Sequence, residues 1–256
     1  MCYEASQARK VKRLEEHYGV RRSEKFEISD TDFIAYHLRG LDHPEMLVIP
    51  QESKEELHPM IWGIMPSYKN GFQLNDYYQQ GKNNVYSLNA QSEKIFTYDT
   101  YKDSILIKRC IIPVTGFFEP HSFMNTTYPF YFTDKVDGIL SIAGIYTESA
   151  DGMVRTFTML TKKASNLFST IHNKDPRGHR QVVLLNKDLQ KEWLRCDLNK
   201  EHITELINLA YDDSTLEYYP VSRNLYSPKI ESNSEYIIQK ADYPELAFNM
   251  DLIGLI

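Results

Sequence analysis

Short runs of apolar and β-branched residues dominate the middle of the chain, and turn-forming residues separate them. Such runs are typical of strands that are buried in a sheet. Pairs such as Asp137-Gly138 and Asp151-Gly152 favour tight hairpins between successive strands. The pattern predicts strands over 46–50, 59–65, 105–112, 116–119, 128–133, 139–146, 154–160, 181–185 and 216–222.

Helical spacing of apolar residues is weaker and lies mostly outside this central region. Residues 5–18 show a weak helical period, and Gly19 follows as a stop. Residues 67–84 are rich in Asn, Gln, Gly and Tyr, which predicts a loop with a short helical piece. Further helices are predicted over 162–171, 188–195 and 200–210.

Strands clustered in the middle with helices around them predict the α+β class. We expect a single compact domain whose curved, mostly antiparallel sheet forms a barrel-like core with peripheral helices. The domain is expected to cover residues 2–235, and residues 236–256 are expected to form a C-terminal extension packed on it.

Composition narrows the class of protein. The chain has 256 residues, of which 42% are hydrophobic, and no apolar run approaches the roughly 20 residues of a membrane helix. Its N-terminal segment is polar and charged, unlike a secretory signal, so a cytoplasmic protein is expected. The three cysteines are widely spaced and odd in number, which argues against a disulfide framework and a cysteine-based zinc site. A net charge of −6 means that any nucleic-acid site must be a local basic patch.

Cys2 directly follows the initiator Met1. Removal of Met1 would leave a thiol and a free α-amine on adjacent carbons. The ordinary pKa values of these groups are about 8.5 and about 7.7–8, so both are partly reactive near neutral pH. An aldehyde could form an imine on the nitrogen, and the sulfur could then close a thiazolidine ring. The alternative is that position 2 merely tolerates a small residue.

Glu119 ends a short aromatic strand, directly after Phe117 and Phe118. Two neighbouring aromatic rings would remove part of the hydration of its carboxylate, which makes it a candidate general acid or base. The alternative is a strand-end glutamate that points to water.

His172 follows the helix predicted over 162–171 and precedes a loop with Pro176. Histidine is the side chain best suited to proton transfer near pH 7, and the C-terminus of a helix stabilises its charged form. The alternative is a histidine that only caps the helix.

Asn89 carries an amide that could orient an amine or an oxyanion. The alternative is that Asn89 caps a helix beginning near Ala90, with Glu93 completing the capping pattern.

Basic residues crowd the region around His172 in an otherwise acidic chain. Such a group could bind phosphates, or it could be a solvated helix face. The residues are Lys162, Lys163, Lys174, Arg177 and Arg180.

Taken in order along the chain, these segments resemble the SOS response-associated peptidase (SRAP) family of abasic-site processing proteins. The resemblance runs from Cys2 to about Arg223. It rests on Cys2, Trp62-Gly63-Ile64-Met65-Pro66, Asn89-Ala90, Arg109-Cys110-Ile111-Ile112-Pro113, Gly116-Phe117-Phe118-Glu119, Ala143-Gly144-Ile145-Tyr146, Ile171-His172 and Pro220-Val221-Ser222.

The resemblance implies a compact fold with a positively charged groove for single-stranded DNA and a Cys2 thiazolidine crosslink to the aldehyde of an abasic site. It implies that Asn89, Glu119 and His172 line the pocket around Cys2, and that a peptidase step removes Met1 before lyase-like imine chemistry. No cofactor and no metal are expected, and a monomer, nucleoid-associated in a bacterium, is expected. The expected DNA-binding residues are Trp62, Gln91, Lys162, Lys163, Lys174, Arg177, Arg180 and Arg223.

The chain departs from the family pattern at several positions. The usual Cys-Gly-Arg start is Cys2-Tyr3-Glu4 here, and Asn-Ala-Arg is Asn89-Ala90-Gln91. Glu-Trp is Glu119-Pro120, and the family's histidine motif continues as Asn173-Lys174-Asp175-Pro176. The residues of the expected chemistry are therefore kept, whereas several of the expected DNA contacts are not.

Two other functions remain open from the sequence. An N-terminal-nucleophile hydrolase also exposes a cysteine after Met removal, with the α-amine as base. Such enzymes run from that cysteine straight into a core strand, and the helix predicted over 5–18 argues against them. A non-catalytic module for single-stranded DNA is the other alternative, and it requires no chemistry at Cys2.

Overall fold

The computed structural model describes residues 2–80, 87–174 and 178–246. Arg177 and Met1 therefore lie outside the described residues. The strands are β1 (Glu4–Gln7), β2 (Arg21–Arg22), β3 (Ala35–Arg39), β4 (Glu45–Pro50), β5 (Glu56–Trp62), β6 (Asn89–Gln91), β7 (Arg109–Val114), β8 (Gly116–Phe123), β9 (Thr126–Asp134), β10 (Leu140–Glu148), β11 (Arg155–Lys163), β12 (Arg180–Val182) and β13 (Leu216–Pro220). The helices are α1 (Val11–Tyr18), α2 (Leu74–Gln80), α3 (Ser104–Ile107), α4 (Asn166–Ile171), α5 (Lys187–Trp193) and α6 (Lys200–Asn208).

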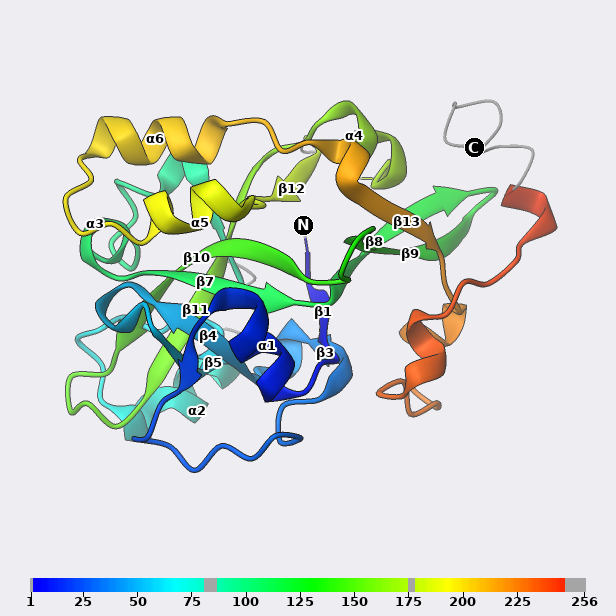
Figure 1. The fold of residues 1–256 in the computed structure, drawn as a ribbon. Helices are drawn as coiled ribbons and strands as arrows, with labels where there is room; N and C mark the ends of the chain where they lie inside the picture. Colours follow the sequence, from blue (N-terminus) through cyan, green and yellow to red (C-terminus); the bar gives the residue numbers. More distant parts are fainter. Residues whose placement is uncertain (1, 81–86, 175–177, 247–256) are drawn as a thin grey trace.

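These strands form two sheets (Figure 1). The larger has the order β12-β11-β10-β7-β4-β5-β2, and β11 also pairs with β5, so β11, β10, β7, β4 and β5 close into a barrel. The smaller has the order β13-β9-β8-β1-β3 and lies beside the barrel. The predicted α+β class with a curved, mostly antiparallel, barrel-like core is confirmed.

Both faces of the barrel wall are buried, and alternate residues pack into different cores. On β7, Ile112 belongs to one buried cluster and Ile111 to another; on β10, Ile142 and Ala143 divide in the same way. This follows from the two-residue period of side chains along a strand. It explains why these segments are continuous apolar runs rather than alternating ones.

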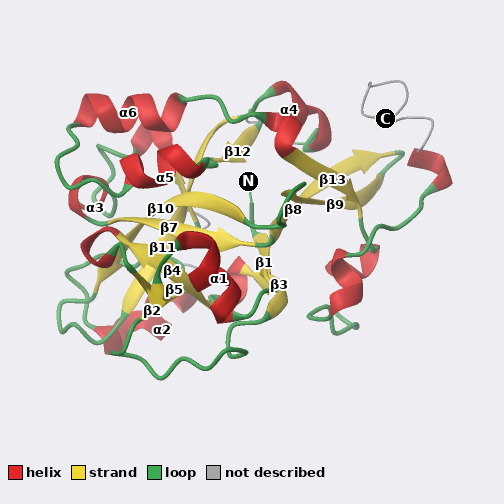
Figure 2. Cartoon of the chain, viewed as in Figure 1, coloured by secondary structure: helices red, strands yellow, loops and turns green. Residues whose placement is uncertain are grey.

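Helices α5 and α6 cover one face of the barrel, as Figure 2 shows in red. Trp193 of α5 and Ile203 and Ile207 of α6 are buried in the same cluster as Ile111. The predicted helices over 188–195 and 200–210 are confirmed to within a few residues.

The helix predicted over 5–18 is wrong in its first part. Residues Glu4–Gln7 form β1, which pairs with β3 on one side and β8 on the other, and only Val11–Tyr18 are helical. Strand pairing on both sides outweighs the weak helical period of this segment. The structure therefore takes Cys2 almost directly into a central strand.

Two element boundaries and one connection also differ clearly from the sequence prediction. Ser104–Ile107 form a helical turn instead of the start of a strand, and Lys162 and Lys163 end β11 instead of beginning a helix. Asp151-Gly152 does join β10 to β11, but Asp137-Gly138 connects the two sheets instead of making a hairpin.

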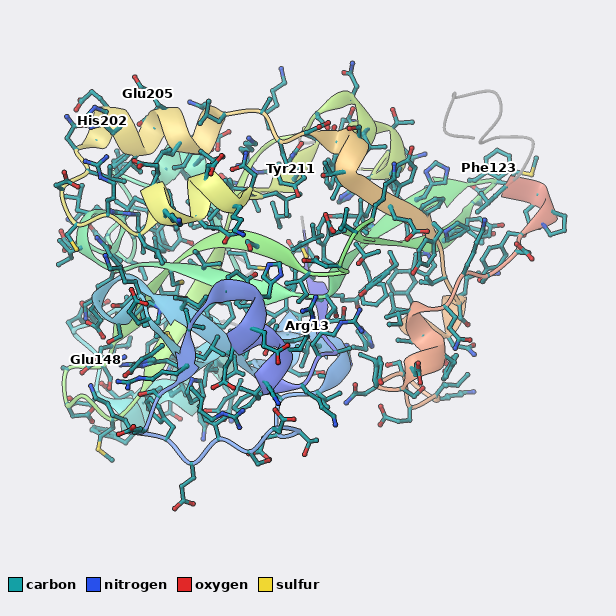
Figure 3. All side chains as sticks on the ribbon, in the orientation of Figure 1. Arg13, Phe123, Glu148, His202, Glu205 and Tyr211 are labelled. Carbon is teal, nitrogen blue, oxygen red and sulfur yellow. The ribbon has the colours of Figure 1, made fainter. Side chains whose placement is uncertain are left out.

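The β8–β9 hairpin turns at Met124-Asn125, a pair with no glycine, both with positive φ. Figure 3 shows Phe123 at the far end of this hairpin.

The C-terminal segment packs on the smaller sheet as far as residue 246. Ile237 is buried, the Tyr243 hydroxyl donates to the Val221 carbonyl, and the Tyr128 hydroxyl donates to Glu245 Oε1 at 2.9 Å. The division at residue 235 stays a prediction. In the described ranges, no helix is long and apolar enough to cross a membrane.

Candidate active site around Cys2

Cys2 lies just ahead of β1, the strand that Figure 1 labels near the centre of the view. Its side chain is fully buried, and its thiol donates to the Glu4 carbonyl at 3.4 Å. The next residue is held as well, because the Gly40 amide donates to the Tyr3 carbonyl at 2.7 Å. Hydrogen bonds thus hold both Cys2 and Tyr3 within the fold.

The sulfur of Cys2 keeps its proton in this environment. Burial raises the pKa of the thiol well above its ordinary value, and the negative charge of Glu119 raises it further. A thiol with a raised pKa is a poor first nucleophile, since the thiolate is the reactive form.

Asn89 reaches Cys2 from the barrel side. It lies on β6, a short strand that runs parallel to β11, with Asn89 opposite Met159. Its Nδ2 donates to the Cys2 carbonyl at 2.7 Å, and its buried Oδ1 has no hydrogen-bond partner among the described residues. The helix cap that the sequence offered as the alternative for Asn89 is therefore wrong.

Glu119 and His172 form a buried pair. Glu119 lies within β8 and is fully buried; His172 lies at the C-terminal end of α4, as predicted. Glu119 Oε2 is 2.7 Å from His172 Nδ1. The charge of Glu119 acts on the Cys2 thiol, so the three groups belong to one site. A histidine in contact with a buried carboxylate can move a proton to or from a neighbouring reacting atom.

The segment that carries His172 is held by two histidines that the sequence analysis did not single out. His121 Nδ1 lies 2.9 Å from the Ile171 carbonyl, and His179 Nδ1 lies 2.7 Å from the His172 carbonyl. His121 could have been found from its position, because residues two apart on a strand share a face and Glu119 is that neighbour.

The basic residues do not form the expected stripe. Lys162 is buried, its Nζ donates to the Leu209 carbonyl, and burial lowers its pKa. Arg180 is paired with Glu93, at 2.9 Å from Arg180 Nη2 to Oε2. Both cations therefore already have a partner within the protein, and their contact with DNA stays a prediction.

Other expected DNA-binding residues vary in exposure. Lys163 and Lys174 are exposed, and within the described ranges neither makes an ion pair. Gln91 is half-buried, and exposed Arg223 lies over the Tyr128 ring at 5.6 Å. Trp62 is fully buried and donates from Nε1 to the Leu88 carbonyl, so it packs in the core and offers no face to a base.

No metal centre accompanies this site in the part of the chain that the structure describes. There, no three His, Cys, Asp or Glu residues come together in a way that could hold a metal ion. Among the described residues, the site consists of the buried Cys2 thiol, the Asn89 amide with its unpartnered Oδ1, and the Glu119–His172 pair.

Comparison with known proteins identifies the class to which this fold and site belong. Residues 1–228 match the family described as SOS response associated peptidase (SRAP), so the chain is a member of that family, as the sequence motifs indicated.

Individual relatives are similar over most of their length. The chain is 26% identical over 217 residues to the abasic site processing protein YoqW of Bacillus subtilis, covering 78% of this chain and 88% of YoqW. It is 26% identical over 195 residues to the abasic site processing protein YoaM of the same organism, covering 73% of this chain and 78% of YoaM. A crystal structure of a protein from Bacteroides thetaiotaomicron superposes with a TM-score of 0.80 at 26% identity, covering 94% of this chain and all of that one.

Proposed function

We propose that this protein captures abasic sites in single-stranded DNA by forming a thiazolidine between Cys2 and the open-ring sugar aldehyde. Relatives named abasic site processing proteins indicate the substrate. The observation that carries the chemistry is that a cysteine at position 2 is buried beside a Glu119–His172 pair and held by Asn89.

The first step is hydrolysis of the Met1–Cys2 peptide bond. Water adds across this bond, methionine leaves, and the α-amine of Cys2 is freed. Asn89 Nδ2 donates to the Cys2 carbonyl, and Asn89 Oδ1 is buried and has no hydrogen-bond partner among the described residues. We assign it to the new amine, which it would aim at the substrate.

The second step is imine formation. The amine of Cys2 attacks the C1′ aldehyde, a C–N bond forms, and the carbonyl oxygen leaves as water after accepting protons. The Glu119–His172 pair moves these protons, and His172 also assists opening of the sugar ring. A positioned acid–base group of this kind contributes about 10²–10⁴ in rate.

The third step is ring closure. The sulfur of Cys2 adds to the imine carbon, an S–C bond forms as the C=N π bond breaks, and the thiol proton ends on the ring nitrogen. The whole capture releases one water per crosslink. Because burial and the charge of Glu119 keep the thiol protonated, nitrogen attacks first and sulfur second. Closure removes the imine, which would otherwise allow β-elimination and strand breakage.

DNA would be held by the exposed cations near this site. Lys163 ends β11, Lys174 follows His172 in the sequence, and both are exposed, so we assign phosphate contacts to them. Lysine–phosphate contacts release counterions, which makes binding weaker at high salt.

An N-terminal-nucleophile hydrolase is the second candidate, and one observation favours it. Cys2 is followed almost directly by the central strand β1, as in such hydrolases, and not by the helix that was predicted over 5–18. Against it stands the raised pKa of the Cys2 thiol, because such a hydrolase attacks with sulfur first.

The decisive experiment incubates the protein with a single-stranded oligonucleotide that carries one abasic site, followed by a denaturing gel. We expect a shifted band in the wild type and none in Cys2→Ala. Cys196→Ala is the matched control, since Cys196 is an exposed free cysteine, and it should crosslink normally. Intact mass should show loss of Met1 and of one water.

Other outcomes would reject the proposal. Equal shifts for wild type and Cys2→Ala would mean that a lysine forms the adduct. Glutaminase activity without any shift would favour the hydrolase. Salt-sensitive DNA binding that is unchanged in Cys2→Ala, again without a shift, would indicate a non-catalytic binding module.

A further inference from the structure

A cavity of about 390 Å³ opens beside the start of β1. Its walls come from β1, β3 with the turn at Asp42, and the segment 225–233; Glu4 of β1 lines it, and the carbonyl of Glu4 accepts from the Cys2 thiol. Burial raises the pKa of the Tyr226 phenol, and the charges of Glu4 and Glu119 raise it further, so this wall lies within electrostatic reach of Glu119. Ligand pockets span roughly 300–1,000 Å³, so the cavity is large enough for a small organic group.

Two polar side chains in the cavity leave hydrogen-bonding capacity unused. His37 is more than nine-tenths buried, and its Nε2 has no hydrogen-bond partner among the described residues. Glu4 Oε1 lies 3.8 Å from that nitrogen, which is too long for a hydrogen bond. The Glu4 carboxylate and His37 Nε2 therefore lie close to each other, and each can form a hydrogen bond with a ligand.

The orientation of His37 is set by the far wall. Ser232 Oγ lies 2.6 Å from His37 Nδ1, and Asn233 Oδ1 accepts from the backbone amides of Tyr36 and His37. With Nδ1 bonded to the serine hydroxyl, the nearby carboxylate of Glu4 favours the tautomer that carries hydrogen on Nε2. Ser232 and Asn233 lie past residue 228, where the family match ends, so this wall is a feature of the chain beyond that match.

Tyr226 adds an aromatic surface. Its side chain is 39% exposed, and Pro228 and Ile230 line the cavity with it. Aromatic rings at the edge of a groove stack with nucleobases, because every base has a π-face. The cavity thus combines a stacking surface with an acceptor–donor pair at its inner end.

We propose that this cavity binds the base next to the abasic residue and prefers cytosine or adenine. In both bases an exocyclic amine lies beside a ring-nitrogen acceptor. Glu4 accepts from the amine, and His37 Nε2–H donates to the ring nitrogen. On the same Watson–Crick edge, thymine and guanine carry a ring N–H that opposes the His37 Nε2–H, beside a carbonyl oxygen that the carboxylate of Glu4 repels. This inference rests on the proposed function, because it takes abasic DNA as the ligand.

The test measures binding separately from capture. Fluorescence anisotropy is recorded with single-stranded oligonucleotides that carry a tetrahydrofuran residue, an abasic analogue with no aldehyde, and with each of the four bases on its 5′ or 3′ side. We expect cytosine or adenine on one of the two sides to bind about tenfold more tightly than thymine or guanine there.

Variants of Glu4 assign the preference to the cavity. Glu4→Gln, whose amide both donates and accepts, should reduce it to within about twofold, and Glu4→Arg should reverse it towards guanine and thymine. Glu201→Gln on exposed α6 changes the net charge equally and should keep the preference.

Equal binding of all four bases on both sides, absence of binding to all of them, or a preference that survives Glu4→Gln would each overturn the inference. Crosslinking of reactive abasic DNA is scored separately. A base preference without crosslinking would reject only the proposed capture chemistry, and crosslinking without a base preference would reject only the cavity assignment.

Discussion

The surroundings of Cys2 and the basic segment 162–180 were both expected to be functional. The structure brings the expected residues together only around Cys2. Around Cys2, residues from two distant strands, β6 and β8, and from one helix end converge on one buried group. In the basic segment, Lys162 is turned into the protein and Arg180 is bound to Glu93. Basic residues that are close in the sequence therefore need not form a common basic surface. Residues that are far apart in the sequence can be brought together by the pairing of their strands.

Disrupting the buried pair should have the largest effect. We expect Glu119→Gln and His172→Gln each to slow crosslinking by about 10²–10⁴, because proton transfer during imine formation is lost. Single-turnover gel assays measure the rate, and circular dichroism checks folding. The double variant should be no slower than the worse single variant, since the two side chains act as a unit. Additive losses would show that the two groups act independently.

The alkylation rate of buried Cys2 should be lower than that of an exposed cysteine by about tenfold or more. A thiol with a raised pKa is less often thiolate, so Cys2 should be alkylated by iodoacetamide at pH 8 far more slowly than exposed Cys196. Its rate should keep rising as the pH increases above about 8.5, where an ordinary thiol is already half ionised. Peptide mass spectrometry follows both residues in one sample. Equal rates at pH 8 would contradict the protonated thiol.

Removing Asn89 should have a smaller effect on rate and a measurable effect on stability. Asn89→Leu leaves the buried Cys2 carbonyl without its donor, which costs about 1–3 kcal/mol in free energy of unfolding. The rate of crosslinking should fall by about tenfold, equivalent to about 1.4 kcal/mol in activation free energy, because Asn89 no longer orients the Cys2 α-amine. Urea denaturation and the gel assay give the two values. Asn75→Leu, at an exposed asparagine of α2, is the control and should change neither strongly.

The smallest expected effect tests the basic segment directly. Lys174→Gln should reduce the slope of log affinity against log salt by about one, as expected for the loss of one phosphate contact. Lys162→Gln should leave that slope unchanged, because the Lys162 ammonium faces the Leu209 carbonyl. Anisotropy at several salt concentrations measures both. An equal change in slope for the two variants would mean that DNA reaches Lys162 after all.

The sequence by itself determined the central strands, the helices α5 and α6, and the four residues proposed for the chemistry. These depend on short-range patterns, such as apolar runs, turn residues and the end of a helix before His172. Membership of the SRAP family was also readable, because its motifs occur in order along the chain.

Only the tertiary structure decided what those residues touch. Residues 4–7 became a strand because β3 and β8 pair with them, and Asn89 entered β6 because β11 lies beside it. Local propensity differs between helix and strand by less than such pairing contributes. The direction in which Lys162 points and the 2.7 Å contact between Glu119 and His172 likewise depend on how distant segments pack. Contacts between distant segments depend on the whole chain, so they cannot be predicted from a short stretch of sequence.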